Sequence, residues 1–451
     1  MNVCVIGTGY VGLVTGACFA EFGVNVTCVD KESDKVDALR AGMIPIYEPG
    51  LDAMVTRNVR EQRLSFSTDT VEAVRNALVV FIAVGTPARE DGSTDLSAVE
   101  DVAREIGRAM DAYKVVVTKS TVPVGTGQRV RAVVEEELRA AGRELRFSVA
   151  ANPEFLREGA AIGDFMRPDR VVIGVEDDQA HAILRDLYRP LYLIETPFVV
   201  TSLETAELAK YAANAFLATK ISFINEMANL CERVGADVHA VAKAMGLDRR
   251  IGGKFLHPGP GFGGSCFPKD TRSAAHFARQ AGETLEIVES VIRVNERQRL
   301  RMVDKIVEAL DGDAAGKTVG LLGLSFKPET DDLREAPAVD IARQLLARGA
   351  LVRAFDPVAM PGAAQLLPDV QFCKHAYGAC EGADAMVLVT EWNQFRMLDL
   401  ERLRRVLRQP VVVDLRNVYE PRSMRAAGFR YTCVGRGTSA AAPAARLKEV
   451  S

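Results

Sequence analysis

The chain has 451 residues, with 48% hydrophobic and 26% charged side chains, which is typical of a globular protein and excludes a disordered or fibrous one. Its 56 basic and 60 acidic residues give a net charge of −4, which disfavours a nucleic-acid partner because such proteins usually carry a basic surplus. No apolar run approaches the roughly 18 residues of a membrane span, and the N-terminal residues lack the features of a signal peptide. We therefore expect a cytoplasmic protein of two or three domains that has no membrane partner.

Eight cysteines are distributed along the chain without a C-x-x-C pair. They are too sparse for a disulfide scaffold, so most are expected to be small buried residues in a reducing compartment, and no metal site is expected. The eight are Cys4, Cys18, Cys28, Cys231, Cys266, Cys373, Cys380 and Cys433. Seven of them have no distinctive surroundings, and Cys266 is the exception.

Strands alternate with helices in the first part of the chain. Residues 2–7 are typical of a buried strand, 11–22 of a helix and 24–30 of a second strand. Further strands are predicted at 78–84, 114–119, 146–150 and 170–175. The alternation indicates a doubly wound, mostly parallel sheet with helices on both faces, and we predict a first domain over residues 1–195.

A long helix is predicted at residues 203–234, because no Pro or Gly interrupts this run before Gly235. Its apolar positions lie nearly all round, which favours burial on several sides, a spine between domains and a dimer contact. Further helices are predicted at 237–246, 270–281 and 285–310. We expect a central, all-helical dimerisation domain over residues 196–310.

A second α/β block follows, with a helix at 336–348 and strands at 317–323, 351–356, 385–390 and 410–414. Its layout echoes the first block, including an acidic residue at the end of the second strand. The expected fold class is α/β, with two Rossmann-like doubly wound domains joined by a central all-helical segment that contains the long spine helix. The second such domain is expected to span 311–437, and the Ala-rich residues 438–451 to form a disordered tail.

A glycine motif, Gly7-Thr8-Gly9-Tyr10-Val11-Gly12, lies between the first strand and the first helix. Gly7 permits a tight turn, Gly9 lets a pyrophosphate approach the helix N-terminus, and Gly12 lets helix and strand pack closely. Asp30 ends the second strand, where a carboxylate binds a ribose diol and repels a 2′-phosphate. We predict NAD rather than NADP as the cofactor, and the alternative is a glycine turn that binds nothing.

Two pairs of polar residues spaced four apart are candidates for chemistry. The segment from Asn152 to Glu158 is typical of an N-cap, a proline at the first helical position and a helical turn, which would place Glu154 and Glu158 on one face. Such carboxylates suit a base and a water-positioning group, and the alternative is a pair of acids favoured by the helix dipole. Lys210 and Asn214 on the long helix suit stabilisation of an oxyanion, and the alternative is a lysine that extends its amine to solvent.

A glycine-rich loop, Gly261-Phe262-Gly263-Gly264-Ser265-Cys266-Phe267-Pro268-Lys269-Asp270, precedes a predicted helix. Its backbone N–H groups can face a ligand, and Cys266 is expected near the helix N-terminus, where a thiolate is stabilised. Lys269 and Asp270 follow within one helical turn. A thiolate beside an acid/base pair indicates covalent catalysis, and the alternative is an inert buried thiol.

These motifs together resemble the nucleotide-sugar 6-dehydrogenases, the family of the UDP-glucose, GDP-mannose and UDP-N-acetylmannosamine enzymes. The resemblance covers roughly residues 1–435, and its motifs stand in the family's order. They are Gly7–Gly12, Val84-Gly85-Thr86-Pro87, Ser120-Thr121-Val122-Pro123, Asn152–Glu158, Gly261–Asp270 and Phe326-Lys327. The cysteine loop and the Asn-Pro-Glu-Phe-Leu segment are specific to this family.

The resemblance implies oxidation of a sugar C6 alcohol to a carboxylate, with two NAD reduced and one water consumed. It implies that Cys266 forms a thiohemiacetal and then a thioester, that Asp270 assists proton transfer, and that Lys210 and Asn214 stabilise the oxyanion. It further implies that Glu154 is the base in thioester hydrolysis and that Thr121 and Glu158 hold the water. The cofactor contacts that it implies, besides the three glycines, are Tyr10, Val11, Asp30, Lys35, Thr86, Thr121, Glu158, Lys269 and Arg334.

For the sugar nucleotide, the resemblance implies contacts from the first part of the chain, the cysteine loop and the C-terminal block. They are Glu154, Phe155, Leu156, Lys210, Asn214, Arg250, Phe255, Leu256, Gly261, Lys327 and Arg416, with Arg250 contributed across a dimer. Cations facing a diphosphate are physically reasonable, although each one taken singly is more often a surface charge. His257 stands where some family members carry a lysine.

UDP-glucose is the favoured substrate, because Arg416 within Asp414-Leu415-Arg416-Asn417 and the segment 250–256 match the UDP-glucose enzymes better than the GDP-mannose enzymes. GDP-mannose and UDP-N-acetylmannosamine are alternatives within the family. A one-step hydroxyacid dehydrogenase would need no cysteine, and a non-catalytic NAD-binding regulator would need only the first domain. We expect a homodimer or a higher homo-oligomer.

Overall fold

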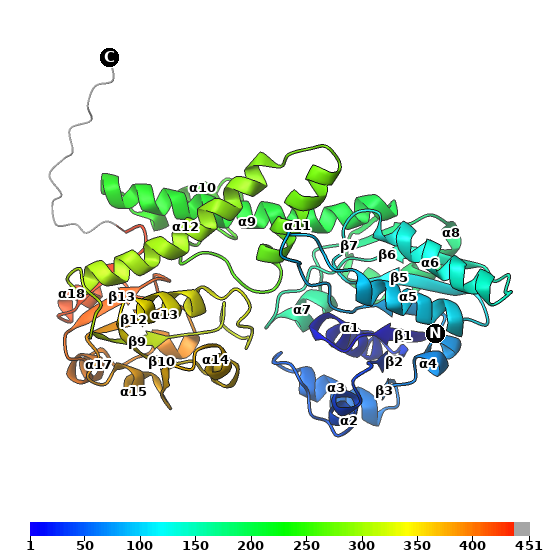
Figure 1. Cartoon of the computed structure of the whole chain (residues 1–451), viewed down its shortest axis with the longest axis horizontal. Helices are drawn as coiled ribbons and strands as arrows, with labels where there is room; N and C mark the ends of the chain where they lie inside the picture. The colour runs from blue at the N-terminus through cyan, green and yellow to red at the C-terminus, as the bar shows by residue number, and fades with distance from the viewer. Residues whose placement is uncertain (437–451) are drawn as a thin grey trace, which may run out of the picture. The chain divides into compact units, whose positions relative to one another are not determined.

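A computed structural model describes residues 1–436, and the chain forms two compact units (Figure 1). Unit 1 contains residues 1–213 and 272–284, and unit 2 contains residues 214–271 and those from 285 onward. Each unit has one β-sheet. The tail predicted at 438–451 lies outside the described residues, and the domain boundaries placed after residues 195 and 310 stay predictions.

The sheet of unit 1 has eight strands in the order β3-β2-β1-β4-β5-β6-β7-β8. Neighbouring strands run parallel, except that β6 and β7 are antiparallel. The strands are β1 (Asn2–Ile6), β2 (Asn25–Val29), β3 (Leu64–Ser67), β4 (Val79–Ile82), β5 (Lys114–Thr118), β6 (Phe147–Ala151), β7 (Val171–Val175) and β8 (Phe198–Thr201). The doubly wound sheet is therefore confirmed, while the sequence did not reveal the four-residue strands β3 and β8.

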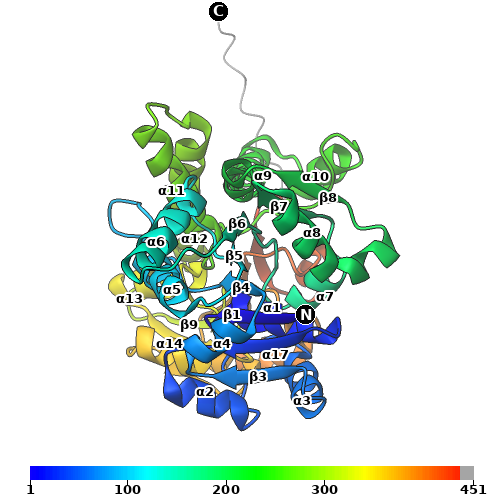
Figure 2. The ribbon, with the colours of Figure 1, turned by 90° about the vertical axis from the view of Figure 1, so that its right-hand side faces the viewer.

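Helices cover both faces of this sheet, because its strands alternate their side chains between two apolar layers. Val3 and Val5 of β1 pack into the layer with α1 and α7, whereas Cys4 and Ile6 pack into the layer with α5 and α6. Figure 2 shows α5 and α6 on one side of the sheet and α7 and α8 on the other. The helices are α1 (Tyr10–Glu21), α2 (Ser33–Arg40), α3 (Leu51–Arg60), α4 (Thr70–Asn76), α5 (Ser97–Ala109), α6 (Thr126–Ala140), α7 (Ala161–Met166), α8 (Asp178–Leu187) and the 3₁₀ helix η1 (Arg189–Ile194).

Four helices form the middle of the sequence, as predicted. They are α9 (Leu203–Val234), α10 (Val238–Gly246), α11 (Phe267–Gln280) and α12 (Glu286–Ala309). The bounds of α9 are those expected from its lack of Pro and Gly. In the single chain, Phe216, Phe223 and Leu230 of α9 remain 65%, 43% and 52% exposed, and their spacing of seven residues places them along one stripe. This stripe is an apolar surface that residues 1–436 do not cover.

The sheet of unit 2 has six parallel strands in the order β11-β10-β9-β12-β13-β14, drawn in yellow to red in Figure 1. The strands are β9 (Thr318–Leu322), β10 (Leu351–Phe355), β11 (Gln371–Phe372), β12 (Ala385–Leu388), β13 (Val411–Asp414) and β14 (Arg430–Cys433). Its helices are α13 (Pro337–Ala347), α14 (Met360–Leu366), α15 (Ala376–Cys380), α16 (Asn393–Arg396), α17 (Leu400–Val406) and α18 (Pro421–Ala426). The second Rossmann-like block is therefore confirmed.

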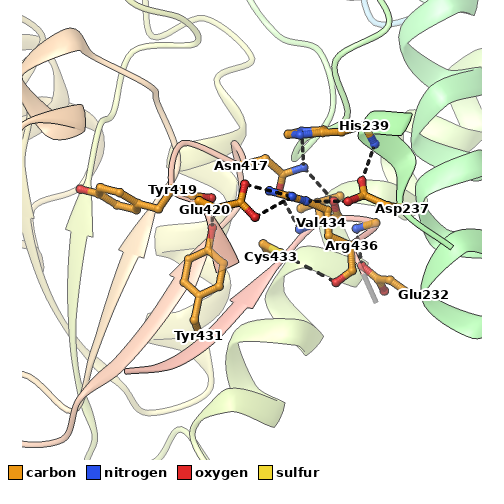
Figure 3. Close-up of polar contacts among 11 residues, drawn as sticks. Glu232, Asp237, His239, Asn417, Tyr419, Glu420, Tyr431, Cys433, Val434 and Arg436 are labelled. Carbon is orange, nitrogen blue, oxygen red and sulfur yellow. Dashed lines mark hydrogen bonds and ion pairs between the residues drawn. The ribbon is translucent and has the colours of Figure 1, made fainter. Parts of the chain in front are cut away.

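Polar contacts fasten the end of unit 2 to its helices (Figure 3). The Gly435 N–H donates to Glu232 Oε1 at 2.8 Å, near the end of α9. The Arg436 guanidinium donates to Asp237 at 3.2 Å and to both oxygens of Glu420, at 3.0 and 3.1 Å. The residues after β14 are thus held to the same unit as the sheet.

All eight cysteines are free thiols, and six of them are buried as expected. The prediction of burial is wrong for Cys373, which is only half-buried. Its thiol lies 3.8 Å from the Gln371 carbonyl oxygen. Cys266 is also half-buried. Within residues 1–436, no helix is both long and apolar enough to cross a membrane.

Candidate active site

The glycine motif of unit 1 adopts the geometry that its sequence predicts. Gly7 has φ +101°, and a Cβ there would lie 2.7 Å from the Ala83 carbonyl oxygen. A Cβ on Gly12 would lie 1.8 Å from the Gly7 carbonyl oxygen, so helix and loop can pack this closely only without a side chain. A Cβ on Gly9 would meet nothing within 4 Å. Gly9 therefore borders open space at the N-terminus of α1, where a pyrophosphate fits.

Asp30 follows β2 and binds the loop that precedes α1. Its Oδ2 accepts hydrogen bonds from the N–H and hydroxyl of Thr8, at 2.9 and 2.7 Å, and pairs with Lys35 Nζ at 2.9 Å. Burial alone raises the pKa of Asp30, but the bonds from Thr8 and Lys35 outweigh it and lower the pKa to about 2. The carboxylate is ionised and 8% exposed, which fits recognition of a ribose diol. Lys35 is an ion-pair partner of Asp30 rather than a solvated surface charge.

Two predicted cofactor residues meet at the loops after β4 and β5. The Thr86 hydroxyl donates to the Thr121 carbonyl oxygen at 2.9 Å, and both residues belong to unit 1. Together with the α1 terminus and Asp30, this edge of the sheet offers the phosphate and ribose partners that NAD requires. The residues present therefore fit a dinucleotide.

Tyr10, the first residue of α1, is joined to the segment before α7 by a buried acid. Its hydroxyl donates to Glu48, and the Gly159 N–H donates to Glu48 at 2.6 Å. The Ala161 N–H donates to the other Glu48 oxygen at 2.8 Å. Burial, together with Glu48, raises the pKa of Tyr10. Sequence reasoning missed Glu48, because a single acid in a Pro- and Gly-containing loop carries no periodic signal.

The helical turn predicted at 152–158 is wrong. Residues 152–157 are irregular, and α7 begins only at Ala161. Glu154 and Glu158 therefore do not share a helical face. The physical reason is that the Asn152 side chain does not cap a helix, because other elements of unit 1 hold both of its polar atoms.

A buried lysine, Lys119, is one of the groups that hold Asn152. Lys119 Nζ and the Tyr188 hydroxyl donate to Asn152 Oδ1 at 3.0 and 2.5 Å, and Asn152 Nδ2 donates to the Val172 carbonyl oxygen at 2.8 Å. Burial lowers the pKa of Lys119 to about 8. Lys119 directly follows β5, whose residues 115–117 are apolar, and a charge at the end of a buried strand is the signal that could have identified it.

Glu154 and Lys210 form a buried ion pair in unit 1. Lys210 Nζ lies 2.9 Å from Glu154 Oε1, and the residues are 3% and 6% exposed, respectively. Burial alone raises the pKa of Glu154, but the Lys210 charge and the Leu156 N–H, which donates to Glu154 at 2.5 Å, bring the pKa below its usual value. Lys210 Nζ also lies 5.3 Å from the centre of the Phe155 ring. Two predicted catalytic residues are thus paired beside a predicted substrate contact.

Glu207 lies on α9 one turn before Lys210 and caps α6. Its two carboxylate oxygens accept from the Gly125 and Gly127 N–H groups, each at 2.7 Å. Glu207 is 3% exposed, and burial raises its pKa to about 7. Sequence reasoning missed this residue as well, because in the sequence it resembles any other polar residue of a long helix.

In unit 2, Cys266 immediately precedes α11, as predicted, and Asp270 lies one turn later. The Asp270 N–H donates to the Cys266 carbonyl oxygen at 2.8 Å, and the Ser265 hydroxyl lies 3.6 Å from the Cys266 thiol. The Asp270 side chain is 1% exposed and accepts from Asn214 Nδ2 and Lys269 Nζ, each at 2.6 Å. Cys266 therefore lies beside an acid whose two oxygens are both fixed.

The glycines of the cysteine loop are required by packing. A Cβ on Gly263 would lie 2.3 Å from the Glu335 carbonyl oxygen, and Gly264 has φ +81° against the Phe326 ring. Two N–H groups of this loop bind protein acceptors and therefore do not face a ligand. The Gly264 N–H donates to the Arg334 carbonyl oxygen at 2.9 Å, and the Phe262 N–H donates to a side-chain oxygen of Asn295 at 2.8 Å.

The remaining predicted contacts of unit 2 differ in how firmly they are held. Arg416 pairs with Glu391 at 3.1 Å and donates to the Val389 carbonyl oxygen at 2.8 Å. Arg250 pairs with Asp248 at 2.6 Å, and its side chain is 89% exposed. The first is a fixed cation, whereas the second projects into solvent.

Other predicted contacts lie near aromatic rings or acids of the same unit. Lys327 Nζ lies 5.4 Å from the Phe326 ring, and Arg334 pairs with Asp332 at 2.8 Å. Phe255 has φ +65°, and its ring lies 6.1 Å from that of Phe267. Two more members of the predicted set, Leu256 and Gly261, are buried.

Known protein families match three successive parts of the chain. Residues 1–192 match the NAD binding domain of the UDP-glucose/GDP-mannose dehydrogenase family, residues 204–297 its central domain and residues 320–421 its UDP binding domain. The chain belongs to this family. The protein is therefore an oxidoreductase that uses NAD.

Individual relatives cover nearly the whole chain. It is 50% identical to UDP-glucose 6-dehydrogenase of Rhizobium meliloti (strain 1021), over 97% of this chain and 100% of the relative. It is 48% identical to UDP-glucose 6-dehydrogenase TuaD of Bacillus subtilis (strain 168), over 96% and 93%. A solved UDP-glucose dehydrogenase from Pyrobaculum islandicum matches with a TM-score of 0.89 at 42% identity, over 97% of this chain and 98% of that one. The family predicted from the motifs is confirmed.

Substitutions at two glycines separate folding from cofactor binding. Gly12→Ala should lower stability by about 1–3 kcal/mol, because the new methyl group overlaps the Gly7 carbonyl. Gly9→Ala should retain wild-type stability but bind NAD more weakly, because its methyl group enters the open space at the α1 terminus. Thermal unfolding and NAD titration measure the two effects. Equal NAD affinity in Gly9→Ala and wild type would contradict the assigned pyrophosphate position.

The raised pKa of Glu207 predicts how stability depends on pH. The folded carboxyl group keeps its proton to about pH 7, whereas the unfolded group loses it near its ordinary value of 4.5. The contribution of Glu207 to the free energy of unfolding is therefore fully present below the unfolded pKa. It is lost as pH rises through about 7, and the total loss is roughly 3 kcal/mol. Glu207→Gln should remove this loss.

Denaturant unfolding at about pH 5 and pH 8 measures the effect. The exposed Glu135 of α6 supplies the matched control, because Glu135→Gln removes one carboxylate without a buried partner. Parallel stability curves for Glu207→Gln and wild type would show that burial does not hold the proton on Glu207.

Proposed function

We propose that the protein oxidises UDP-glucose to UDP-glucuronate in two NAD-dependent steps through a thioester on Cys266. The observation that carries this proposal is Cys266 at the start of α11, one turn from an Asp270 carboxylate fixed by Asn214 and Lys269. A dehydrogenase that stopped at an aldehyde or ketone would need a hydride acceptor but no nucleophile. The names of the relatives support UDP-glucose as the sugar nucleotide.

NAD, when bound, supplies the hydride acceptor for each two-electron oxidation. The first oxidation converts the C6 alcohol into an aldehyde, and the Cys266 thiolate then forms a C–S bond to C6. The resulting thiohemiacetal loses two further electrons to give a thioester. Water attacks the thioester carbonyl, the C–S bond breaks, and the carboxylate product and the thiol are released. One alcohol and one water thus yield one carboxylate and two NADH.

The roles of the other residues are assigned from their chemistry together with the family resemblance. Lys210 and Asn214 lie one turn apart on α9, and an ammonium and an amide both stabilise an oxyanion at C6. Glu154 is ionised and can accept a proton from the water that attacks the thioester. Thr121 and Glu158 are assigned to hold that water. Asp270 is assigned to exchange the proton of the thiol.

For the nucleotide, Arg416 and Lys327 supply cations suited to a diphosphate. Contacts to the sugar and uridine are assigned by the family resemblance to Phe155, Leu156, Phe255, Leu256 and Gly261. The match of residues 320–421 to a UDP binding domain supports this assignment. Cofactor contacts are assigned to Gly7, Gly9, Tyr10, Val11, Gly12, Asp30, Lys35, Thr86, Lys269 and Arg334. The three matched ranges also support a functional division into segments 1–195, 196–310 and 311–437.

We further propose a homodimer that pairs through α9. The exposed stripe of Phe216, Phe223 and Leu230 is apolar and unpaired within the described chain, and contiguous apolar surface of this kind marks an interaction site. The Arg250 side chain is 89% exposed and pairs with Asp248, two residues away, so this pair leaves the guanidinium accessible to a second subunit.

The stoichiometry of the reaction tests the proposal. Two NADH should form for each UDP-glucose consumed, because both a hydride acceptor site and a nucleophile are present. Absorbance of NADH, combined with quantification of the remaining UDP-glucose, gives the ratio. GDP-mannose and UDP-N-acetylmannosamine assayed in parallel define the sugar nucleotide, and a ratio of one would exclude the thioester route.

Replacement of the nucleophile tests the role of Cys266. Cys266→Ser should slow complete turnover at least ~100-fold, because an alkoxide forms less readily than a thiolate and an ester is hydrolysed more slowly. The matched control is Cys373→Ser, which changes a half-buried thiol with no assigned role. Steady-state NADH formation measures both variants. Wild-type turnover in Cys266→Ser would remove this residue from the mechanism.

A further inference from the structure

A small cavity lies in unit 1 between the loop after β5, the end of β6 and α9. Thr118 and Ala151, the last residues of β5 and β6, line it from the sheet, and Glu207 and Lys210 line it from α9. Thr121 belongs to its wall on the loop side. About 10 Å³ is open to the centre of a water molecule, and roughly 10–15 Å³ is what one water needs.

One hydroxyl in the wall of this cavity has no protein partner. Thr118 is 2% exposed, and its Oγ1 is buried without a hydrogen bond to any described group. Buried hydroxyls are nearly always hydrogen-bonded, either to protein or to ordered water. The cavity and the unpaired hydroxyl are independent observations, and both indicate a bound water.

The other polar groups of the wall complete the set that a buried water needs, which is two to four partners. Glu207 offers carboxyl oxygens as acceptors, and Lys210, whose ammonium donates to Glu154, offers N–H donors. A water can donate to Glu207 and accept from Thr118 and Lys210 at the same time. The site therefore has a donor and acceptor pattern that matches one water molecule.

We propose that this cavity holds one buried water, and that Thr118 and Glu207 act through it as positioning residues for the Lys210 ammonium. The water links the Lys210 ammonium to Thr118 and Glu207 on the side of the sheet, while Glu154 holds the ammonium by an ion pair. Lys210 is thereby fixed from two directions. Thr118 and Glu207 need no contact with the substrate for this role.

We assign this water a structural role, separate from that of the water consumed in thioester hydrolysis, and Thr121 adjoins both because it is assigned to hold the hydrolytic water and lines this cavity. Its walls include Thr118 and Ala151, each 2% exposed, so it lies against the interior of the sheet. A water in such a place serves as part of the structure and does not need to be replaced at each turnover. The existence of the water is independent of the proposed function, whereas its effect on turnover rests on that function.

The first arm of the test is crystallographic. In a crystal structure of the full chain, the wild type and Thr118→Ser should show density for a water in this cavity, because both keep the hydroxyl. Thr118→Val should lose that density. Absence of the water from the wild type, or its persistence unchanged in Thr118→Val, would overturn the proposal.

The second arm is kinetic. Thr118→Val should lower kcat for UDP-glucose oxidation about 10-fold with KM unchanged, since a displaced Lys210 affects the reacting state more than binding. Thr118→Ser should restore wild-type kcat.

Thr15→Val is the matched control, because Thr15 Oγ1 is also buried and unpaired but does not line this cavity. An equal kcat for Thr118→Val and Thr15→Val would show that Thr118 does not position Lys210. If the wild type oxidises no UDP-sugar, the proposed function is wrong. The crystal structures would still show whether the cavity holds a water.

Discussion

Buried carboxylates order the loops at the carboxyl ends of the strands. A loop that leaves a buried strand carries backbone N–H groups that neither the sheet nor water satisfies. In unit 1, Asp30 accepts from Thr8, Glu48 from residues 159–162, and Glu207 from residues 125–127. These loops carry the residues to which cofactor and substrate roles are assigned. The geometry of the candidate site therefore depends on buried acidic side chains that accept hydrogen bonds from the loop backbone.

An aspartate follows the second strand of each sheet, and the two aspartates differ in their hydrogen-bond partners and exposure. In unit 2, Asp356 accepts from the N–H groups of Leu324 and Ser325 at 2.7 and 3.1 Å, just as Asp30 accepts from Thr8 in unit 1. Asp356 also accepts from Trp392 Nε1 at 3.1 Å and is completely buried, whereas Asp30 keeps 8% exposure. A ribose hydroxyl needs an accessible carboxylate oxygen, so the shared acid suits a dinucleotide only in the first sheet.

The sequence predicted those elements whose residues repeat a strong local pattern, such as the uninterrupted helix at 203–234 and the buried strands. The helical turn expected at 152–158 is absent because a local capping pattern cannot show that Lys119 binds the Asn152 side chain. Glu48 and Glu207 gave no signal for the same reason, since they bind backbone groups 111 and 82 residues away. The sequence motifs identified the residues to which catalytic and binding roles are assigned. The groups that hold those residues in position are recognised only from their three-dimensional contacts.

The contacts of the residues after β14 show how far the chain must extend for unit 2 to keep all of its polar links. Arg436 joins Asp237, which caps α10, to Glu420, which precedes α18, and the neighbouring Gly435 binds the end of α9. A truncation before Gly435 would remove all of these links at once and leave Asp237 without its arginine. An expression variant that omits the last residues should therefore keep Arg436, and an affinity tag belongs after it.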